Sequence, residues 1–347
     1  MTARIAPDRA VQGVLAVLSG TALRQAAAEI GMDPDELADA AEVYRAAGRA
    51  ALESRSGESW YQVRVQFADW DTAEQTAARW LNPAFQHAEN GGVLDRWWFI
   101  RKSPCWRMRF RVGVEATMAD LEAAIGGILD RLTTAGEIVR WRPTIYEPEN
   151  VAFGGQLGMD IAHRLFHADS TGTLDYLRRH DAARSGELSL GRRELSVLLC
   201  GALLQGAGQE WHEQAACWHG VTQLRPLPPE TPLDRLRDLA GDLQGLLSID
   251  AAPTSGLYNP SGPLGHAAPW ATGFDQAGHA LGEAAADGTL QRGLRDVLAH
   301  HIIFHWNRLG LPTKTQAILA RAARDAMLNP PVPDVVRIVE SANVARS

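Results

Sequence analysis

The sequence predicts an α+β protein: a ferredoxin-like βαββαβ portion, then a mostly helical portion, with a small helical module at the N-terminus. Three observations support this fold class. Residues 60–146 alternate between strand-like and helix-like patterns, residues after 155 show almost only helical patterns, and residues 9–52 form short helices with cap signals. The 347 residues, 46% of them hydrophobic, suffice for one large or two ordinary domains with a full core.

We assign residues 1–56 to the N-terminal helical module and residues 57–347 to the larger domain. A helix beginning at Leu23 ends at Gly31, and Asp33-Pro34 indicates the start of the next helix. The spacing imitates a helix-turn-helix, but the second helix opens with acidic residues such as Asp35 and Glu36, which would repel phosphate. DNA binding is therefore rejected for this module, which leaves peptide docking or structural packing.

Residues 57–155 form the predicted sheet portion. Val63, Val65 and Phe67 alternate with polar residues, which indicates a strand with one buried face. A helix follows at about 72–89. Strands at 97–101 and 106–112, a helix at 117–134 and a strand at 138–146 complete a β-α-β-β-α-β order.

Residues 156–330 form the predicted helical portion. Helices are expected at 159–166, 171–183, 192–206, 209–219 and 233–247, and again from about 274 to 327. Residues 251–272 are rich in Pro, Gly, Ser and Ala, and we expect there a long loop without a packed element.

Composition excludes several classes of protein. The net charge is −7 and the basic residues are spread along the chain, so we expect no nucleic-acid partner. No apolar run reaches membrane-spanning length and the chain opens without a signal peptide, so we expect no membrane partner. The three cysteines form no C-x-x-C pair, which suits a reducing cytoplasm. No phosphate-binding, dinucleotide-binding or zinc motif is present, so no cofactor and no metal are expected.

Four sequence blocks resemble the C-terminal, glutamate-eliminating domain of the lanthipeptide dehydratases, and together they span much of the chain. The blocks are Trp97–Arg101 with Trp106–Phe110, then Tyr146–Ser170, Arg192–Gln214 and His301–Gly310. The order and spacing of the four blocks carry the resemblance. It implies a catalytic domain that acts on a modified peptide.

The chain departs from the eliminating enzymes at the positions of their catalytic groups. Cys105 and Ile303 stand where the family has histidines, and Ala152 stands where it has an arginine, whereas Arg107 and Arg109 are retained. This pattern resembles the stand-alone pyridine synthases of thiopeptide biosynthesis. The family is also described as "thiopeptide-type bacteriocin biosynthesis". Those enzymes join two dehydroalanines in a formal aza-[4+2] cycloaddition, then lose water and the leader peptide.

The resemblance implies a leader-bearing, azole-containing precursor peptide as partner, no cofactor, and a possible homodimer. Two other functions stay open. A stand-alone glutamate eliminase is favoured by the retained Arg107 and Arg109 and opposed by Ala152 and Ile303. A non-catalytic scaffold that presents the precursor would also suit a fold that has lost catalytic groups.

The candidate catalytic residues are Tyr146, Glu149 and His305. Tyr146 and Glu149 lie where the last predicted strand meets the Gly154-Gly155 loop, and a tyrosine beside a carboxylate can donate a proton. The alternative for Tyr146 is a buried tyrosine with a satisfied hydroxyl. His305 is a candidate acid or base, or else a core histidine, and no third ligand suggests a metal.

The candidate substrate-binding residues come from the strand that alternates arginine with apolar residues and from two of the similar blocks. The resemblance favours Arg107 and Arg109 over Arg111 for a peptide-binding pocket, with a solvated outer face as the alternative. The remaining candidates are Trp97, Asn307 and Arg308.

Overall fold

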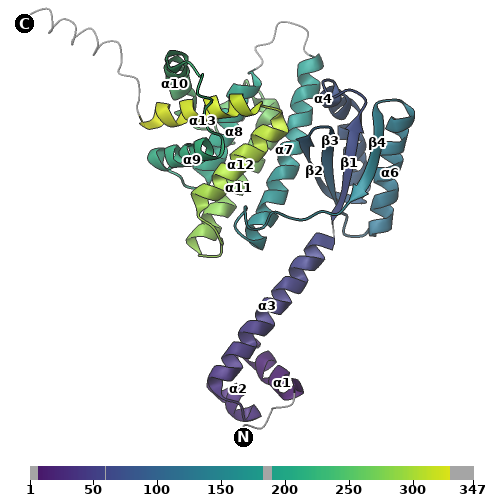
Figure 1. Ribbon diagram of the computed structural model, residues 1–347, viewed down its shortest axis with the longest axis vertical. Helices are drawn as coiled ribbons and strands as arrows, with labels where there is room; N and C mark the ends of the chain where they lie inside the picture. Colours follow the sequence, from purple (N-terminus) through teal and green to yellow (C-terminus); the bar gives the residue numbers. More distant parts are fainter. Residues whose placement is uncertain (1–6, 59, 183–189, 329–347) are drawn as a thin grey trace, which may run out of the picture. The chain divides into compact units, whose positions relative to one another are not determined.

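The computed structural model describes residues 7–58, 60–182 and 190–328. The chain divides into two compact units, Met1–Ser59 and Trp60–Ser347. The fold is α+β as predicted, because the second unit combines a four-stranded antiparallel sheet with many helices (Figure 1). Two of the expected boundaries, at Ala183 and at residue 330, lie outside the described residues.

The N-terminal unit contains three helices, α1 (Pro7–Leu18), α2 (Leu23–Ile30) and α3 (Pro34–Glu58). Gly31 ends α2 in the left-handed conformation with φ 65°, which favours glycine. Asp33 caps α3, since its Oδ1 accepts the backbone N–H of Asp35 at 2.9 Å. A small core is shared by the three helices. Its buried members are Val14, Ala26, Ala27, Leu37 and Ala41.

The sheet has the ferredoxin-like order that the sequence predicts. Its strands are β1 (Trp60–Phe67), β2 (Leu94–Lys102), β3 (Cys105–Val112) and β4 (Ile138–Thr144). They are arranged β2-β3-β1-β4, and every neighbouring pair is antiparallel. Strands β2 and β4 are therefore the two edges of the sheet.

One face of the sheet is covered by the helices that connect its strands. These are α4 (Ala73–Thr76), a five-residue π-helical turn (Ala77–Leu81), α5 (Asn82–Asn90) and α6 (Met118–Thr134). Thr117 and Asp120 form a capping box that begins α6. Val63, Val65 and Phe67 of β1 are buried in this core, as their alternation predicts.

The long helix α7 (Gln156–Ala182) seals the β2 edge. The Nδ1 atom of His167 lies 3.3 Å from the amide nitrogen of Trp97, and the Phe99 N–H donates to Ser170 Oγ at 3.2 Å. These contacts satisfy backbone groups that an open edge would leave unpaired. The prediction of two separate helices in this segment is wrong, because the polar residues at its middle bind β2 instead of ending the helix.

The remaining helices are α8 (Arg192–Gly206), α9 (Trp211–Leu224), α10 (Leu233–Leu247), α11 (Ala268–Ala286), α12 (Leu294–Leu309) and α13 (Thr313–Leu328). Helices α8 and α11 approach closely, since a Cβ on Gly278 would lie 2.3 Å from the Leu203 carbonyl oxygen. Glu74 of α4 joins the sheet portion to α8 through an ion pair with Arg192, at 2.6 Å. None of the described helices combines the length and hydropathy needed to cross a bilayer.

The prediction of an unpacked loop at 251–272 is also wrong. The segment contains two short 3-10 helices, Gly256–Tyr258 and Gly265–Ala267, and α11 already begins at Ala268. Tyr258, Leu264 and Trp270 are buried. Glycine and proline do mark turns here, but the apolar residues between them pack into the main core.

The contact between α7 and the β2 edge predicts a stability effect. Ser170→Ala leaves the buried Phe99 N–H without its acceptor, so the free energy of unfolding should fall by about 1–3 kcal/mol. Urea unfolding measures this change. Ser248→Ala, which removes an exposed hydroxyl on the end of α10, is the control and should change stability by less than about 0.5 kcal/mol. Equal losses in the two variants would contradict the role of Ser170.

Candidate functional site

The candidate site lies on the sheet face opposite to α6. Residues paired across antiparallel strands project to the same face, so Trp98 of β2, Arg109 of β3 and Gln62 of β1 form one row. Gln62 Nε2 donates to Thr144 Oγ1 at 2.8 Å and to the Ile145 carbonyl oxygen at 2.7 Å. These bonds fix the chain as it leaves β4 and direct the next residues back over the sheet.

Tyr146 enters an apolar cluster between this sheet face and the first half of α7. The buried members of the cluster are Trp60, Trp98, Tyr146, Phe153, Met159, Ala162 and Phe166. The rings of Trp60 and Trp98 both lie edge-on to Tyr146, with centroids 5.8 and 5.9 Å away. The phenol is therefore held by aromatic packing on two sides.

Gly154 and Gly155 allow the chain to fold back here. Their φ angles are 85° and 93°, in the region that favours glycine. A Cβ on Gly154 would lie 2.6 Å from Leu290, and one on Gly155 would lie 2.6 Å from Gln291. The two glycines therefore bring the segment that carries Tyr146 against the α11–α12 connection and begin α7 at Gln156.

Tyr146 and His163 of α7 form a buried polar pair. The Tyr146 hydroxyl lies 2.7 Å from His163 Nε2. Burial, together with the charges of nearby arginines such as Arg111 and Arg109, lowers the pKa of His163 to about 3. Burial also raises the pKa of Tyr146 above its usual value, against the opposing charge of Arg109. Both side chains are therefore neutral at physiological pH, and the phenol keeps its proton.

Arg109 supplies a buried cation beside this pair. Arg109 is only 5% exposed, and its guanidinium lies 4.1 Å from the Trp98 ring centroid and 5.3 Å from that of Tyr146. Burial lowers its pKa to about 10, so it stays charged at neutral pH. Its Nε has no partner, and Nη1 makes one long contact of 3.5 Å with the Arg107 carbonyl oxygen.

Among the described residues no carboxylate forms an ion pair with Arg109, although the charge of Glu149 acts on both Arg109 and Tyr146. Glu149 itself is exposed. Buried guanidinium groups are ordinarily paired or hydrogen-bonded. A buried arginine with free donors is therefore suited to bind a carbonyl or carboxylate oxygen of a ligand.

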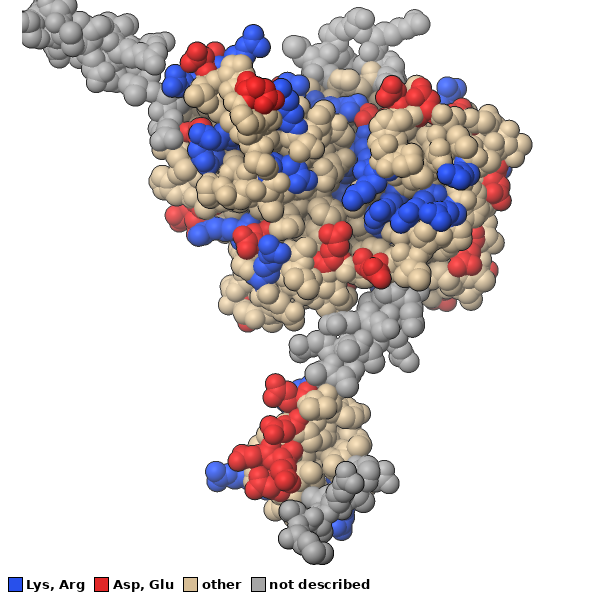
Figure 2. Space-filling model, in the orientation of Figure 1, with Lys and Arg blue, Asp and Glu red and all other residues tan. Residues whose placement is uncertain are grey.

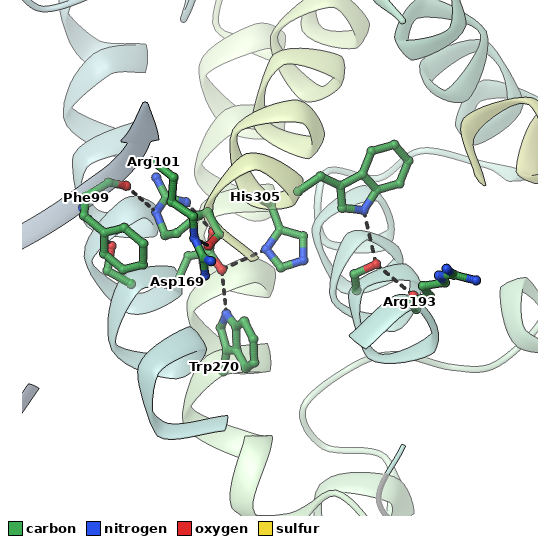
Figure 3. A network of polar contacts seen from close by, with 10 residues as sticks. Phe99, Arg101, Asp169, Arg193, Trp270 and His305 are labelled. Atoms are coloured by element: carbon green, nitrogen blue, oxygen red, sulfur yellow. Dashed lines mark hydrogen bonds and ion pairs between the residues drawn. The ribbon is translucent and has the colours of Figure 1, made fainter. Parts of the chain in front are cut away.

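A second buried cation, Arg308, is bound in the core, although its Nη2 is buried without a partner. Asp169 of α7 accepts hydrogen bonds from His305 Nδ1 at 2.8 Å and Trp270 Nε1 at 2.9 Å, and forms an ion pair with Arg308 (Figure 3). Arg308 Nε also donates to the Phe99 carbonyl oxygen at 3.2 Å. Burial opposes the charged form of Asp169, but His305 and Arg308 outweigh it and hold the pKa of this carboxyl below its usual value.

The structure brings some of the predicted site residues together. Tyr146, Arg109 and the exposed Glu149 share one site. Arg107 lies two residues before Arg109 on the same face of β3. His305 and Arg308 are each only 1% exposed and are bound to Asp169. They do not face solvent, and the Arg308 guanidinium lies 5.9 Å from the ring centroid of Trp98 and 4.7 Å from that of Phe166, both members of the apolar cluster around Tyr146.

Two predicted substrate-binding residues lie elsewhere. Trp97 is fully buried on the helix-covered face and packs against Phe85, with ring centroids 4.9 Å apart. Its neighbour Trp98 faces the site instead, since successive strand residues project to opposite faces. Asn307 lines a separate cavity of about 330 Å³ with Arg101, and its Oδ1 accepts Gln316 Nε2 at 2.9 Å.

Sequence reasoning missed Trp98, His163 and Asp169. His163 and Asp169 both stand in the block that carries the family resemblance, six residues apart on α7. That spacing is about 1.7 turns of a helix, so the two side chains lie on different faces and no local pattern marks them as functional. Within the part of the chain that the structure describes, no group of three or more His, Cys, Asp or Glu side chains is placed to hold a metal ion.

Residues 60–327 match the family described as lantibiotic biosynthesis dehydratase, C-terminal. The chain belongs to this family. Among solved structures, the dehydratase-family domain is similar to the tRNA-dependent lantibiotic dehydratase MibB from Microbispora sp. 107891. The identity is 21% and the TM-score 0.59, over 82% of this chain and 29% of MibB.

The dehydratase-family domain is also similar to TbtD, the pyridine synthase from thiomuracin biosynthesis. The identity is 15% and the TM-score 0.54, over 78% of this chain and 98% of TbtD. At these identities both comparisons show the fold alone. No curated protein matches the chain.

The Asp169 cluster predicts a large loss of stability when its charge is removed. Asp169→Asn leaves the Arg308 charge buried without a counter-ion, so the free energy of unfolding should fall by about 3–5 kcal/mol. Asp234→Asn removes a carboxylate whose side chain is 93% exposed and is the matched control, with an expected loss below about 1 kcal/mol. Chemical denaturation compares the two, and similar losses would contradict a core role for Asp169.

The low pKa of His163 predicts how stability depends on pH. The unfolded chain takes up a proton near pH ~6.5, whereas the folded protein does so only near pH 3, so stability falls as pH drops between these values. His163→Gln removes that contribution and should make the decline shallower, by up to about 1.4 kcal/mol per pH unit.

Denaturation curves at pH 7, 5.5 and 4 measure this slope. His212→Gln, which replaces an exposed histidine of α9, should keep the slope of the unaltered protein. If His163→Gln leaves the slope of stability against pH unchanged, His163 is not held neutral by its surroundings.

Proposed function

We propose that the Tyr146 site is the active site of a pyridine synthase. The enzyme would join two dehydroalanines of a leader-bearing azole peptide in a formal [4+2] cycloaddition, and then release water and the leader to form a pyridine-centred macrocycle. The supporting observation is the neutral Tyr146–His163 pair, 2.7 Å apart, beside the free donors of Arg109. This arrangement offers hydrogen-bond donors to amide oxygens.

The cycloaddition needs one amide in its iminol form, in which a proton has moved from nitrogen to oxygen. The iminol nitrogen then lies inside a C=C–N=C unit, and the new six-membered ring forms through two C–C bonds between the ends of this unit and the second alkene, without loss of atoms. When His163 carries its hydrogen on Nε2, it donates to the Tyr146 oxygen and leaves the phenol hydrogen free for the substrate. Tyr146 then donates to the amide oxygen that becomes the iminol hydroxyl. His163, with a pKa of about 3, orients the phenol and is not itself the base.

Aromatisation follows in two eliminations. The ring hydroxyl, protonated by Tyr146, leaves as water while one ring CH2 loses a proton that restores the phenol, and the leader then leaves as an amide while the other ring CH2 loses a proton. Arg109 binds a carbonyl oxygen of the peptide through its unpartnered Nε–H. One preorganised donor of this kind stabilises developing negative charge by about 3–4 kcal/mol. Glu149 is exposed at the rim and can accept a proton that the substrate releases.

The segment that carries Tyr146 also exposes apolar side chains. Ile145 and Val151 are each 86% exposed and Leu157 is 44% exposed. Exposed apolar residues gathered in one segment are typical of a binding surface. Azole rings and dehydroalanine side chains are apolar and planar, so this rim is suited to hold the two alkenes together. Such positioning supplies up to ~7–11 kcal/mol in well-oriented intramolecular reactions.

Glutamate elimination is less well supported by the same site. Ala152 packs against the apolar cluster at the position where the resemblance places an arginine. Arg109 is then a buried cation beside Tyr146 with an unpartnered Nε, while the nearby Arg308, whose Nη2 also has no partner, is held by its ion pair with Asp169. A site for a glutamyl ester would have to bind the glutamate carboxylate and withdraw an α-proton as well. TbtD, a pyridine synthase, has this fold over 98% of its length, so the fold is compatible with cyclisation.

Mass spectrometry distinguishes the three functions. The protein alone is incubated with a leader-bearing peptide that contains two dehydroalanines and several azoles. We expect a macrocycle together with free leader amide. Loss of glutamate from a glutamylated substrate would instead establish an eliminase. An unchanged mass with tight binding in calorimetry would establish a scaffold, and either result overturns the proposal.

Substitution of the phenol tests its role in the reaction. Tyr146→Phe keeps the aromatic packing but removes the donor, so kcat should fall about 10²–10⁴-fold with little change in KM. Single-turnover mass spectrometry measures this loss. Tyr258→Phe removes the hydroxyl of another buried tyrosine, one without a hydrogen-bond partner, and should keep full activity. Equal rates for both variants would exclude Tyr146 as the proton donor.

A further inference from the structure

A basic groove lies beside the Tyr146 site on the same face of the sheet. It has a volume of about 430 Å³. Arg107, which lines the groove, is two residues from Arg109 along β3, so the two side chains are about 7 Å apart along the strand. The lining residues are Arg64, Gln66, Lys102, Ser103, Pro104, Cys105, Arg107, Arg140, Trp141 and Arg142.

Three of these arginines stand in one row across the sheet. Arg64 of β1 is directly opposite Arg107 of β3 on one side and Arg142 of β4 on the other. Adjacent strands are about 4.8 Å apart, and like charges directly opposite one another destabilise a sheet. Figure 2 shows Lys and Arg side chains gathered in a band on this part of the molecule. A row of this kind lowers stability unless another molecule supplies negative charge.

The described residues supply no such charge. Arg64, Lys102, Arg107, Arg140 and Arg142 form no ion pair with any carboxylate in the described part of the chain. The Nε of Arg64 is buried without a partner. Arg140 donates only to the neutral side chain of Gln66, at 3.0 Å. The donors of this groove are therefore available to a ligand with several negative groups.

We infer that this groove binds an acidic segment of a peptide, with its carboxylates against Arg64, Arg107 and Arg142. Arginine pairs with carboxylate through two parallel hydrogen bonds, which a row of guanidinium groups can repeat along a peptide. The groove leads along β3 to Arg109 and the Tyr146 site. The inference rests on the proposed function in one respect, namely that the peptide is the leader of the substrate, held while its core reacts.

The net charge of the chain and the residues that line the groove favour a peptide over a nucleic acid. The chain carries a net charge of −7, which repels a long polyanion. The walls also include apolar surface, because Pro104 and Trp141 line the groove and the Trp141 indole N–H is already bound to Asp130 at 2.8 Å. Alternating acidic and apolar side chains match this combination better than a phosphate backbone does.

Fluorescence anisotropy tests the inference with a labelled octapeptide of alternating Glu and Leu. Its matched control replaces every Glu by Gln. The full chain should bind the Glu peptide at least about tenfold more tightly than the Gln peptide, and added salt should weaken the binding. In the double variant Arg64→Gln/Arg142→Gln, affinity should fall roughly a hundredfold, about tenfold for each guanidinium. Arg237→Gln, whose side chain is 79% exposed on α10, should bind as the unaltered protein does.

A melting curve separates loss of binding from loss of folding. The double variant removes repulsion between directly opposed arginines, so its Tm should stay equal or rise while its affinity falls. Unchanged affinity in the double variant would overturn the inference. Tighter binding of a single-stranded RNA octamer than of the Glu peptide, or self-association that the same double variant abolishes, would overturn it too.

A separate experiment tests whether the peptide that binds in the groove is the leader of the substrate. A substrate whose leader carries Gln in place of Glu should cyclise with a raised KM and an unchanged kcat. If it cyclises with the KM of the original, the groove inference fails and the synthase proposal stands. If the protein cyclises nothing but still binds the Glu peptide through Arg64 and Arg142, the synthase proposal fails and the acidic-peptide groove stands.

Discussion

One buried carboxylate holds the larger unit together. Asp169 lies at the middle of α7 and binds Trp270 of α11 and both His305 and Arg308 of α12. Arg308 in turn holds the Phe99 carbonyl oxygen at the edge of the sheet. Two opposite charges removed from water are stable together only when their remaining donors and acceptors are bound, as most are here. This cluster therefore fixes three helices to β2, and with them the position of Trp98.

The site depends on that fixed edge. The Trp98 ring contacts two guanidinium groups. That of Arg308 lies 5.9 Å from the ring centroid, and that of Arg109 lies 4.1 Å from it. The neutral Tyr146–His163 pair then lies beside Arg109, and burial keeps the pair neutral and the arginine charged. A charged groove and a largely neutral, aromatic cluster share one sheet face. The first is suited to hold an acidic segment, the second to polarise an amide.

The sequence predicts the sheet well because its signals are local. Period-two alternation locates β1 and β3, and an amphipathic pattern locates α6. It does not tell which face of the sheet Trp97 occupies, because the apolar run of β2 contains no alternation to read. It identifies Tyr146 but not His163, because the two meet only after the chain folds back at Gly154 and Gly155. For His305 it leaves a catalytic and a core role open, because nothing local shows that Asp169, 136 residues away, binds it.

A crystal structure with a leader-bearing analogue that cannot cyclise tests the central claim most directly. The account predicts that an amide oxygen of the core peptide lies within hydrogen-bond distance of the Tyr146 hydroxyl and of Arg109. The cleft of about 250 Å³ between α7 and the start of α11, lined by Tyr176 and Trp270, offers another place for a peptide. A core peptide bound in that cleft, with no contact to Tyr146 or Arg109, would contradict the account.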